Sequence, residues 1–150
     1  NGAGAFDGMI AGQMLDLYAE KLPASTDAEA LIKHIEEMKT GRLIRYACEA
    51  GAILGKASPQ QRQALIDYSR KIGIAFQIAD DVEGEQELVG KTLNKDAAQG
   101  KVTFVTLYGL DNAKQISRQL IDEARQIIAI FGDKAENLSA LAQYIIDRKY

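Results

Sequence analysis

A long apolar run near the middle of the chain ends in Phe76-Gln77-Ile78-Ala79-Asp80-Asp81. On a helix, Gln77, Asp80 and Asp81 lie on one arc beside the apolar stripe, because they are spaced i, i+3 and i+4. Two neighbouring carboxylates beside apolar side chains are costly to keep charged without a cation. Mg²⁺ is typically bound by one or two carboxylates together with waters and substrate phosphates. The stretch therefore predicts a metal-diphosphate site, with an acidic pair on a solvated helix face as the alternative.

Lysines occur on both sides of this run. Lys39-Thr40-Gly41 precedes it, and a glycine inside a helical pattern permits a kink or a close backbone approach. The glycine- and charge-rich stretch 84–101 follows it and contains Lys91, Lys95 and Lys101. Taken singly these are ordinary surface lysines, but ammonium groups bind phosphate as point charges. Their order along one helical chain favours a site that binds a diphosphate.

A second polar pair, Gln13 and Asp16, repeats the i, i+3 spacing within an earlier apolar helical pattern. Polar groups among apolar neighbours either find hydrogen-bond partners or line a wet cavity. A structural hydrogen bond is the simpler interpretation of this pair.

The apolar spacing predicts helices along nearly the whole first half of the chain. We expect a first helix over residues 6–19. The capping-box pattern Thr26-Asp27-Ala28-Glu29 opens a second helix that runs toward Ala50. Ser58-Pro59 marks the start of a third helix, which we expect to end near Val82.

The second half begins with the stretch 84–101, which we interpret as a loop of functional length. A short helix is expected over residues 103–110. Two helices with apolar stripes complete the chain. Their stripes are Ile116, Leu120, Ala124, Ile127 and Phe131, and Leu138, Leu141, Ala142, Ile145 and Ile146. The predicted class is all-α, a helical bundle within a single domain over residues 1–150.

Composition excludes several classes of function. With 150 residues, of which 47% are hydrophobic, the chain fits one globular domain or a piece of a larger one. No apolar run approaches the roughly 20 residues of a membrane span. A net charge of -3 argues against nucleic-acid binding through phosphate contacts alone. Cys48 and His34 are the only residues of their types and cannot build a thiolate or imidazole metal site. We expect Cys48 to be buried, His34 to lie on a helix surface, and the compartment to be the cytosol.

Together these motifs resemble the C-terminal half of a trans-isoprenyl diphosphate (polyprenyl) synthase. They are most similar to those of bacterial farnesyl diphosphate synthases, the geranyltranstransferases. The resemblance extends from Gly12-Gln13-Met14-Leu15-Asp16-Leu17 through Met38-Lys39-Thr40-Gly41 to Tyr144-Ile145-Ile146-Asp147-Arg148-Lys149-Tyr150, and residues 76–81 are its most diagnostic part. It implies a helical bundle of the isoprenoid-synthase type around a deep cavity, lacking here its N-terminal helices, and usually a homodimer. Because the chain begins at Asn1, without methionine, we expect it to be part of a longer protein.

The resemblance also implies an activity. A cytoplasmic, Mg²⁺-dependent prenyltransferase would condense isopentenyl diphosphate with dimethylallyl or geranyl diphosphate to give geranyl or farnesyl diphosphate. Its partners would be these isoprenoid diphosphates, with no nucleic acid and no membrane span. Asp80 and Asp81 would bind the metal as the second of two aspartate-rich motifs. Lys39, Lys91 and Lys101 would contact the allylic diphosphate.

A second set of residues would serve the carbocation that forms when the diphosphate departs. Thr40 and Gln77, with the carbonyl of Lys39, would face this cation. Gln13 and Asp16 would line the cavity nearby. Metal and lysines would stabilise the charge growing on the diphosphate, and apolar walls would keep water from the cation.

The chain departs from the family pattern at one informative position. A third aspartate is expected four residues after Asp80, where this sequence has Gly84, as though a short segment were absent. The first aspartate-rich motif is absent as well. The alternatives are a non-catalytic helical subunit or scaffold of the same family, a terpene cyclase or head-to-head condensing enzyme, and a bundle without a ligand. Lys39-Thr40-Gly41 and the stretch ending in Lys101 favour chain elongation.

Overall fold

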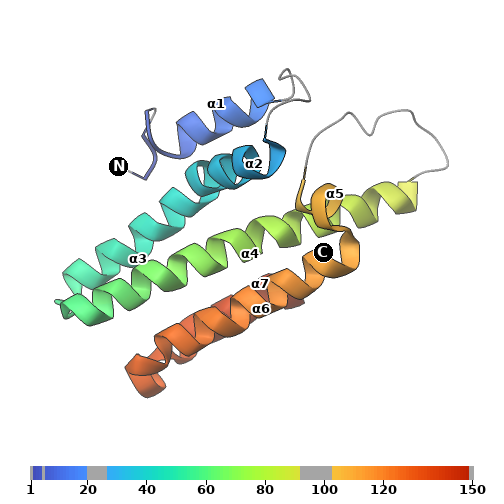
Figure 1. The fold of residues 1–150 in the computed structure, drawn as a ribbon. Coiled ribbons are helices and arrows are strands. Elements are labelled where there is room, and N and C mark those ends of the chain that lie inside the picture. The colour runs from blue at the N-terminus through green and yellow to red at the C-terminus, as the bar shows by residue number, and fades with distance from the viewer. Residues whose placement is uncertain (1, 5, 20–26, 92–102, 149–150) are drawn as a thin grey trace.

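The computed structural model describes residues 2–4, 6–19, 27–91 and 103–148, and these contain helices and no strand (Figure 1). The predicted all-α class is therefore confirmed. The elements are α1 (Met9–Ala19), α2 (Ala28–Glu36), the π-helical η1 (Glu37–Gly41), α3 (Arg42–Leu54), α4 (Pro59–Lys91), α5 (Phe104–Tyr108), α6 (Leu110–Ile128), the 3₁₀-helical η2 (Ala129–Ala135) and α7 (Glu136–Asp147).

Helix α4 is the central element of the bundle. In Figure 1 it runs through the middle, with α2 and α3 on one side and α6 and α7 on the other, while α1 lies outside α2 and η1. Ser58 caps its start by accepting a hydrogen bond from the Gln61 backbone N–H at 3.2 Å. No helix in the described part of the chain is long and apolar enough to cross a membrane.

The core forms where α4 packs against α6 and α7. The buried Tyr68 hydroxyl donates a hydrogen bond to the carbonyl of Leu138 at 2.7 Å, which joins α4 to α7. The Ser117 hydroxyl of α6 donates to the carbonyl of Ala75 at 3.2 Å. Burying each large aliphatic side chain contributes about 1.5–3 kcal/mol. The main cluster contains Tyr68, Ile72, Ala75, Ile121, Ala124, Ile128, Ala135, Ala142 and Ile145.

A smaller cluster lies toward the C-terminal end of α4 and includes the short helix α5. Its buried members are Ile32, Ile78, Val82, Phe104, Val105 and Ala113. On α6 the apolar stripe predicted from the sequence coincides only partly with the buried face. The fully buried set is Ala113, Ser117, Ile121, Ala124 and Ile128, and the remaining stripe residues are half-buried beside it.

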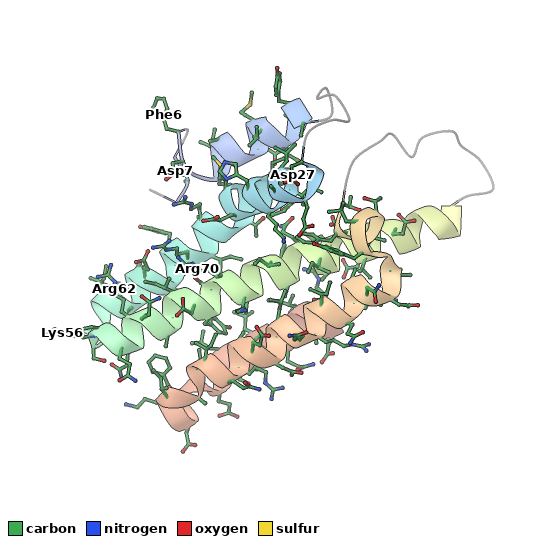
Figure 2. All side chains as sticks on the ribbon, in the orientation of Figure 1. Phe6, Asp7, Asp27, Lys56, Arg62 and Arg70 are labelled. Carbon is green, nitrogen blue, oxygen red and sulfur yellow. The ribbon has the colours of Figure 1, made fainter. Side chains whose placement is uncertain are left out.

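The predicted start of the first helix was wrong, whereas the second helix starts within the predicted pattern but with a different cap. The first helix begins at Met9 rather than at residue 6, because the chain turns there and the Met9 N–H donates to the Gly2 carbonyl at 2.9 Å. Phe6 is 95% exposed and points away from the helices (Figure 2). The second helix is capped by Asp27, whose carboxylate accepts from the Ala30 N–H at 3.2 Å. Thr26, the predicted cap, lies outside the described residues.

The predicted end of the third helix was also wrong. Helix α4 continues past Val82 to Lys91, so the first part of the expected loop is helical. Gly84 lies inside the helix with no atom within 4 Å of an added Cβ. A helical glycine costs only about 1 kcal/mol relative to alanine, and Glu and Gln residues that favour helices follow it. The remainder of the expected loop, residues 92–102, lies outside the described residues.

The kink or close approach predicted at Gly41 is confirmed as the π-helical turn η1, which α1 and α4 both cross closely. A Cβ on Gly73 of α4 would lie 3.4 Å from the Gly41 Cα. A Cβ on Gly12 of α1 would lie 2.3 Å from the Lys39 backbone N and 2.7 Å from its Cα. The backbones of α1 and η1 therefore touch, and only glycine fits at this crossing.

Replacing Gly12 with alanine should push α1 away from η1 and lower the free energy of unfolding by about 1–3 kcal/mol, as in other overpacked contacts. Urea unfolding of the full-length protein measures this. The matched control is Gly51→Ala in α3, where nothing lies within 4 Å of the added Cβ. That variant should be neutral or stabilised by up to about 1 kcal/mol. Equal midpoints for the two variants would contradict the close crossing.

Candidate diphosphate and metal site

The crossing of α1 over η1 brings Lys39 to Asp16. The Lys39 Nζ lies 2.8 Å from Asp16 Oδ2, and Asp16 is only 7% exposed. With Gly12, Asp16 forms the buried face of α1, whereas Gln13 is exposed. The structural hydrogen bond predicted for this pair is therefore confirmed for Asp16. Its effect is to hold the Lys39 ammonium in one place.

Lys39 remains charged at neutral pH. Its partial burial alone would lower its pKa, but the hydrogen bond and charge of Asp16 outweigh that effect. Glu36 and Asp80 attract the same ammonium, and the pKa of Lys39 is raised above its ordinary value. The contribution of Asp80 indicates that Lys39 lies within electrostatic reach of this carboxylate on α4.

A buried hydrogen bond joins η1 to α4 beside this lysine. Gln77 is 7% exposed, and its Nε2 donates to Thr40 Oγ1 at 2.5 Å. Two residues predicted to face a carbocation are thus in direct contact, although 37 positions separate them in the sequence. The bond fixes the Gln77 amide, so that its orientation does not depend on a ligand.

Asp80 forms an ion pair with Arg148, which immediately follows α7. The Arg148 Nε also lies 3.2 Å from Glu83 Oε1, and its guanidinium lies 4.5 Å from the centre of the Phe76 ring. The Arg148 side chain is only 5% exposed, whereas that of Asp80 is 44% exposed. The pair therefore presents a carboxylate, and not the guanidinium, to solvent.

Asp81 contacts the start of α5. Its Oδ2 accepts a hydrogen bond from the Phe104 backbone N–H at 2.8 Å, at the first residue of α5. A carboxylate stabilises a helix start by satisfying an N–H that has no partner within the helix. Asp81 therefore positions the start of α5 beside α4.

The structure brings together Asp16, Lys39, Thr40, Gln77 and Asp80, with Asp81 following Asp80 on α4. Lys91 is the last residue of α4, and nothing is described of its side chain. Lys95 and Lys101 lie outside the described residues. The contact of Arg148 with Asp80 was not predicted. The only sequence signal for it is that Arg148 is a basic residue at the end of the last helix. The close approach at Gly12 was missed too, although its position four residues before Asp16 puts both on one face.

An apolar groove lies next to Arg148, the ion-pair partner of Asp80. It has a volume of about 560 Å³ and runs along α4 between α3 and α7, with Arg148 at its border. Phe76, Ile72, Tyr68, Leu141 and Tyr144 line it. Cys48, also in this wall, is half-buried, and burial raises the pKa of its thiol. His34 is on the helix surface, as predicted.

The carboxylate oxygens of Asp80 and Asp81 on α4 fit a hard cation. Asp80 is accessible, and Asp81 is adjacent to it. Among the described residues, no group of three or more Asp, Glu, His or Cys side chains could hold a metal. Such a two-carboxylate set matches Mg²⁺, which takes its remaining ligands from water and phosphate.

Residues 3–145 match the family model described as polyprenyl synthetase, and the chain belongs to this family. It is 38% identical to farnesyl diphosphate synthase of Escherichia coli (strain K12), over 97% of this chain and 50% of that protein. It is 36% identical to the mitochondrial geranylgeranyl pyrophosphate synthase 6 of Arabidopsis thaliana, over 95% of this chain and 44% of that protein.

Solved structures of farnesyl diphosphate synthases are similar to this chain in fold as well as in sequence. The crystal structure of an FPP/GFPP synthase from Zymomonas mobilis has a TM-score of 0.81 and 36% identity, covering 95% of this chain and 47% of that one. A putative farnesyl-diphosphate synthase from Marinomonas sp. MED121 has a TM-score of 0.79 and 36% identity, covering 97% and 49%. The chain thus spans about half the length of the relatives that it matches.

Proposed function

We propose that the protein containing this chain is a trans-prenyltransferase of the farnesyl diphosphate synthase kind. It condenses isopentenyl diphosphate with dimethylallyl or geranyl diphosphate to give geranyl or farnesyl diphosphate. The single observation that carries this proposal is the grouping of Lys39, Thr40, Gln77 and Asp80 from two crossing segments. The names of its relatives support the same class of reaction.

Each group has a chemical task in this reaction. Lys39, held by Asp16, stabilises the negative charge that grows on the departing diphosphate. Thr40 and Gln77 present oxygen dipoles toward the developing carbocation. The apolar groove along α4 suits a hydrocarbon tail and excludes water, which would quench the cation. Lys91 and Lys101 are proposed as further diphosphate contacts, and Gln13 as a residue of the cavity wall.

Asp80 and Asp81 are the proposed holders of Mg²⁺. When bound, the ion would supply positive charge next to the diphosphate oxygens. The protein's own part is to present the accessible Asp80 carboxylate within electrostatic reach of Lys39. We also propose a cytoplasmic homodimer.

The activity is tested by incubating the full-length protein with isopentenyl diphosphate and dimethylallyl, geranyl or farnesyl diphosphate in turn. We expect release of diphosphate and a product one isoprene unit longer, with both abolished by EDTA. A complete lack of product with every primer would refute the proposal. That outcome would favour the second candidate, a non-catalytic subunit of the same family. Gly84, which stands where the family has a third aspartate, is the observation in favour of that candidate.

A further inference from the structure

Arg148 has an environment that the proposed reaction does not explain. Its guanidinium is buried against the Phe76 ring and is bracketed by Asp80 and Glu83, two carboxylates one helical turn apart on α4. Its own side chain is 5% exposed, compared with 44% for Asp80 and 32% for Glu83. A charge that is so well buried requires paired, hydrogen-bonded partners.

Arg148 joins α7 to α4 at the site. Arg148 is the residue that immediately follows α7, and its backbone N–H donates to the Tyr144 carbonyl at 3.0 Å. Through Asp80 and Glu83 it ties this end of α7 to α4. It is also one of the residues that line the apolar groove.

We infer that Arg148 is a latch that competes with a divalent cation for Asp80. This inference rests on the metal-binding role of Asp80 in the proposed function. Both cations need the same carboxylate, and Asp80 is the exposed member of the pair, so an ion from solvent reaches it directly. Metal binding then weakens the hold of Arg148 on α4. By reciprocity, the latch weakens metal binding by the same factor.

The experiment uses Mn²⁺ alone as the probe, titrated into the full-length protein and followed by electron paramagnetic resonance. Arg148→Gln removes the competitor and should lower the Mn²⁺ Kd about fivefold or more, within the usual range of coupling between sites. Arg148→Lys keeps the charge but lacks the planar fork that contacts both carboxylates. It should therefore also bind Mn²⁺ more tightly than the native protein. Arg125→Gln is the matched control, because the hydrogen bonds described for Arg125 go to Ser139 and Gln143 of α7 and not to Asp80 or Glu83.

Amide hydrogen exchange gives a second measurement, because a change of charge alone would not alter the exchange rates of α7. Mn²⁺ should speed amide exchange in the last turn of α7, residues 144–147, in the native protein. In Arg148→Gln the same amides should already exchange fast and should not respond to Mn²⁺. Thermal melts confirm that each variant is folded. If Arg148→Gln is not folded, Arg148→Lys is measured in its place.

The outcomes separate this inference from the proposed function. An unchanged or larger Kd in both Arg148 variants, with prenyl transfer retained in the native protein, would overturn the latch alone. A lower Kd in the glutamine variant but not in the lysine variant would show that Arg148 acts only through its charge, and this result would also overturn the latch. If neither the native protein nor Arg148→Gln binds Mn²⁺, the metal role of Asp80 fails, and the latch fails with it.

Discussion

Replacing Lys39 with glutamine should lower kcat for prenyl transfer by about a hundredfold to a thousandfold, the usual effect of removing one preorganised donor to a developing anion. The native ammonium lies 2.8 Å from Asp16 and is held at the α1–η1 crossing before any substrate arrives. It needs no reorganisation when charge develops on the diphosphate. Glutamine fills a similar space but cannot supply the charge. Steady-state kinetics with geranyl and isopentenyl diphosphates measure the loss.

Lys33→Gln is the control for this prediction. Lys33 lies on α2, is well exposed, and pairs with Glu29 on its own helix at 2.5 Å. Its replacement should leave kcat within about twofold of native, since exposed pairs of this kind contribute little. A Lys39→Gln enzyme as fast as Lys33→Gln would show that Lys39 is only a structural partner of Asp16.

The sequence was informative where a local pattern carries the physical cause. The i, i+3, i+4 spacing of Gln77, Asp80 and Asp81 puts them on one arc of a helix, and the structure places them so. The glycine of Lys39-Thr40-Gly41 predicted an irregular turn, which is the π-helical η1. Both features follow from residues within a few positions of one another.

Long-range contacts could not be predicted in the same way. Nothing in the sequence links Arg148 to Asp80, 68 positions away, because their contact depends on how α7 packs against α4. Gly84 misled the prediction of the helix end for a related reason. Its cost in a helix is only about 1 kcal/mol, and the neighbouring turns of a long helix packed on α6 offset it.

The apolar residues of α1 do not mark its buried face. A stripe of apolar residues predicts a buried face, yet Ile10, Met14 and Leu17 are exposed, and the small or polar Gly12 and Asp16 are buried. The reason is the close crossing with η1, which admits no side chain at Gly12. Of the polar pair Gln13 and Asp16, only Asp16 lies on the inward face of α1.

Replacing Asp80 with asparagine should lower kcat/KM by roughly a thousandfold, because a metal that stabilises the leaving group supplies several kcal/mol. Asparagine keeps the shape and one oxygen but removes the charge that attracts both Mg²⁺ and Lys39. Arg148 would keep Glu83 and the Phe76 ring as partners, so the helix ends should remain joined. The loss should be partly recovered at high Mg²⁺ concentration, since the defect is one of metal binding. Kinetics over a range of Mg²⁺ concentrations test this.

Asp67→Asn provides the comparison on the same helix. Asp67 pairs with Arg70 at 3.4 Å, accepts a hydrogen bond from Gln63 at 3.0 Å, and keeps 39% of its side chain exposed. Removing its charge changes the net charge of α4 by the same amount as Asp80→Asn, but away from Lys39 and Arg148. It should therefore leave the Mg²⁺ dependence unchanged. If both variants lose activity to the same extent, the effect comes from the overall charge of α4 and Asp80 is not a metal ligand. If only Asp80→Asn responds to added Mg²⁺, the ion acts at Asp80.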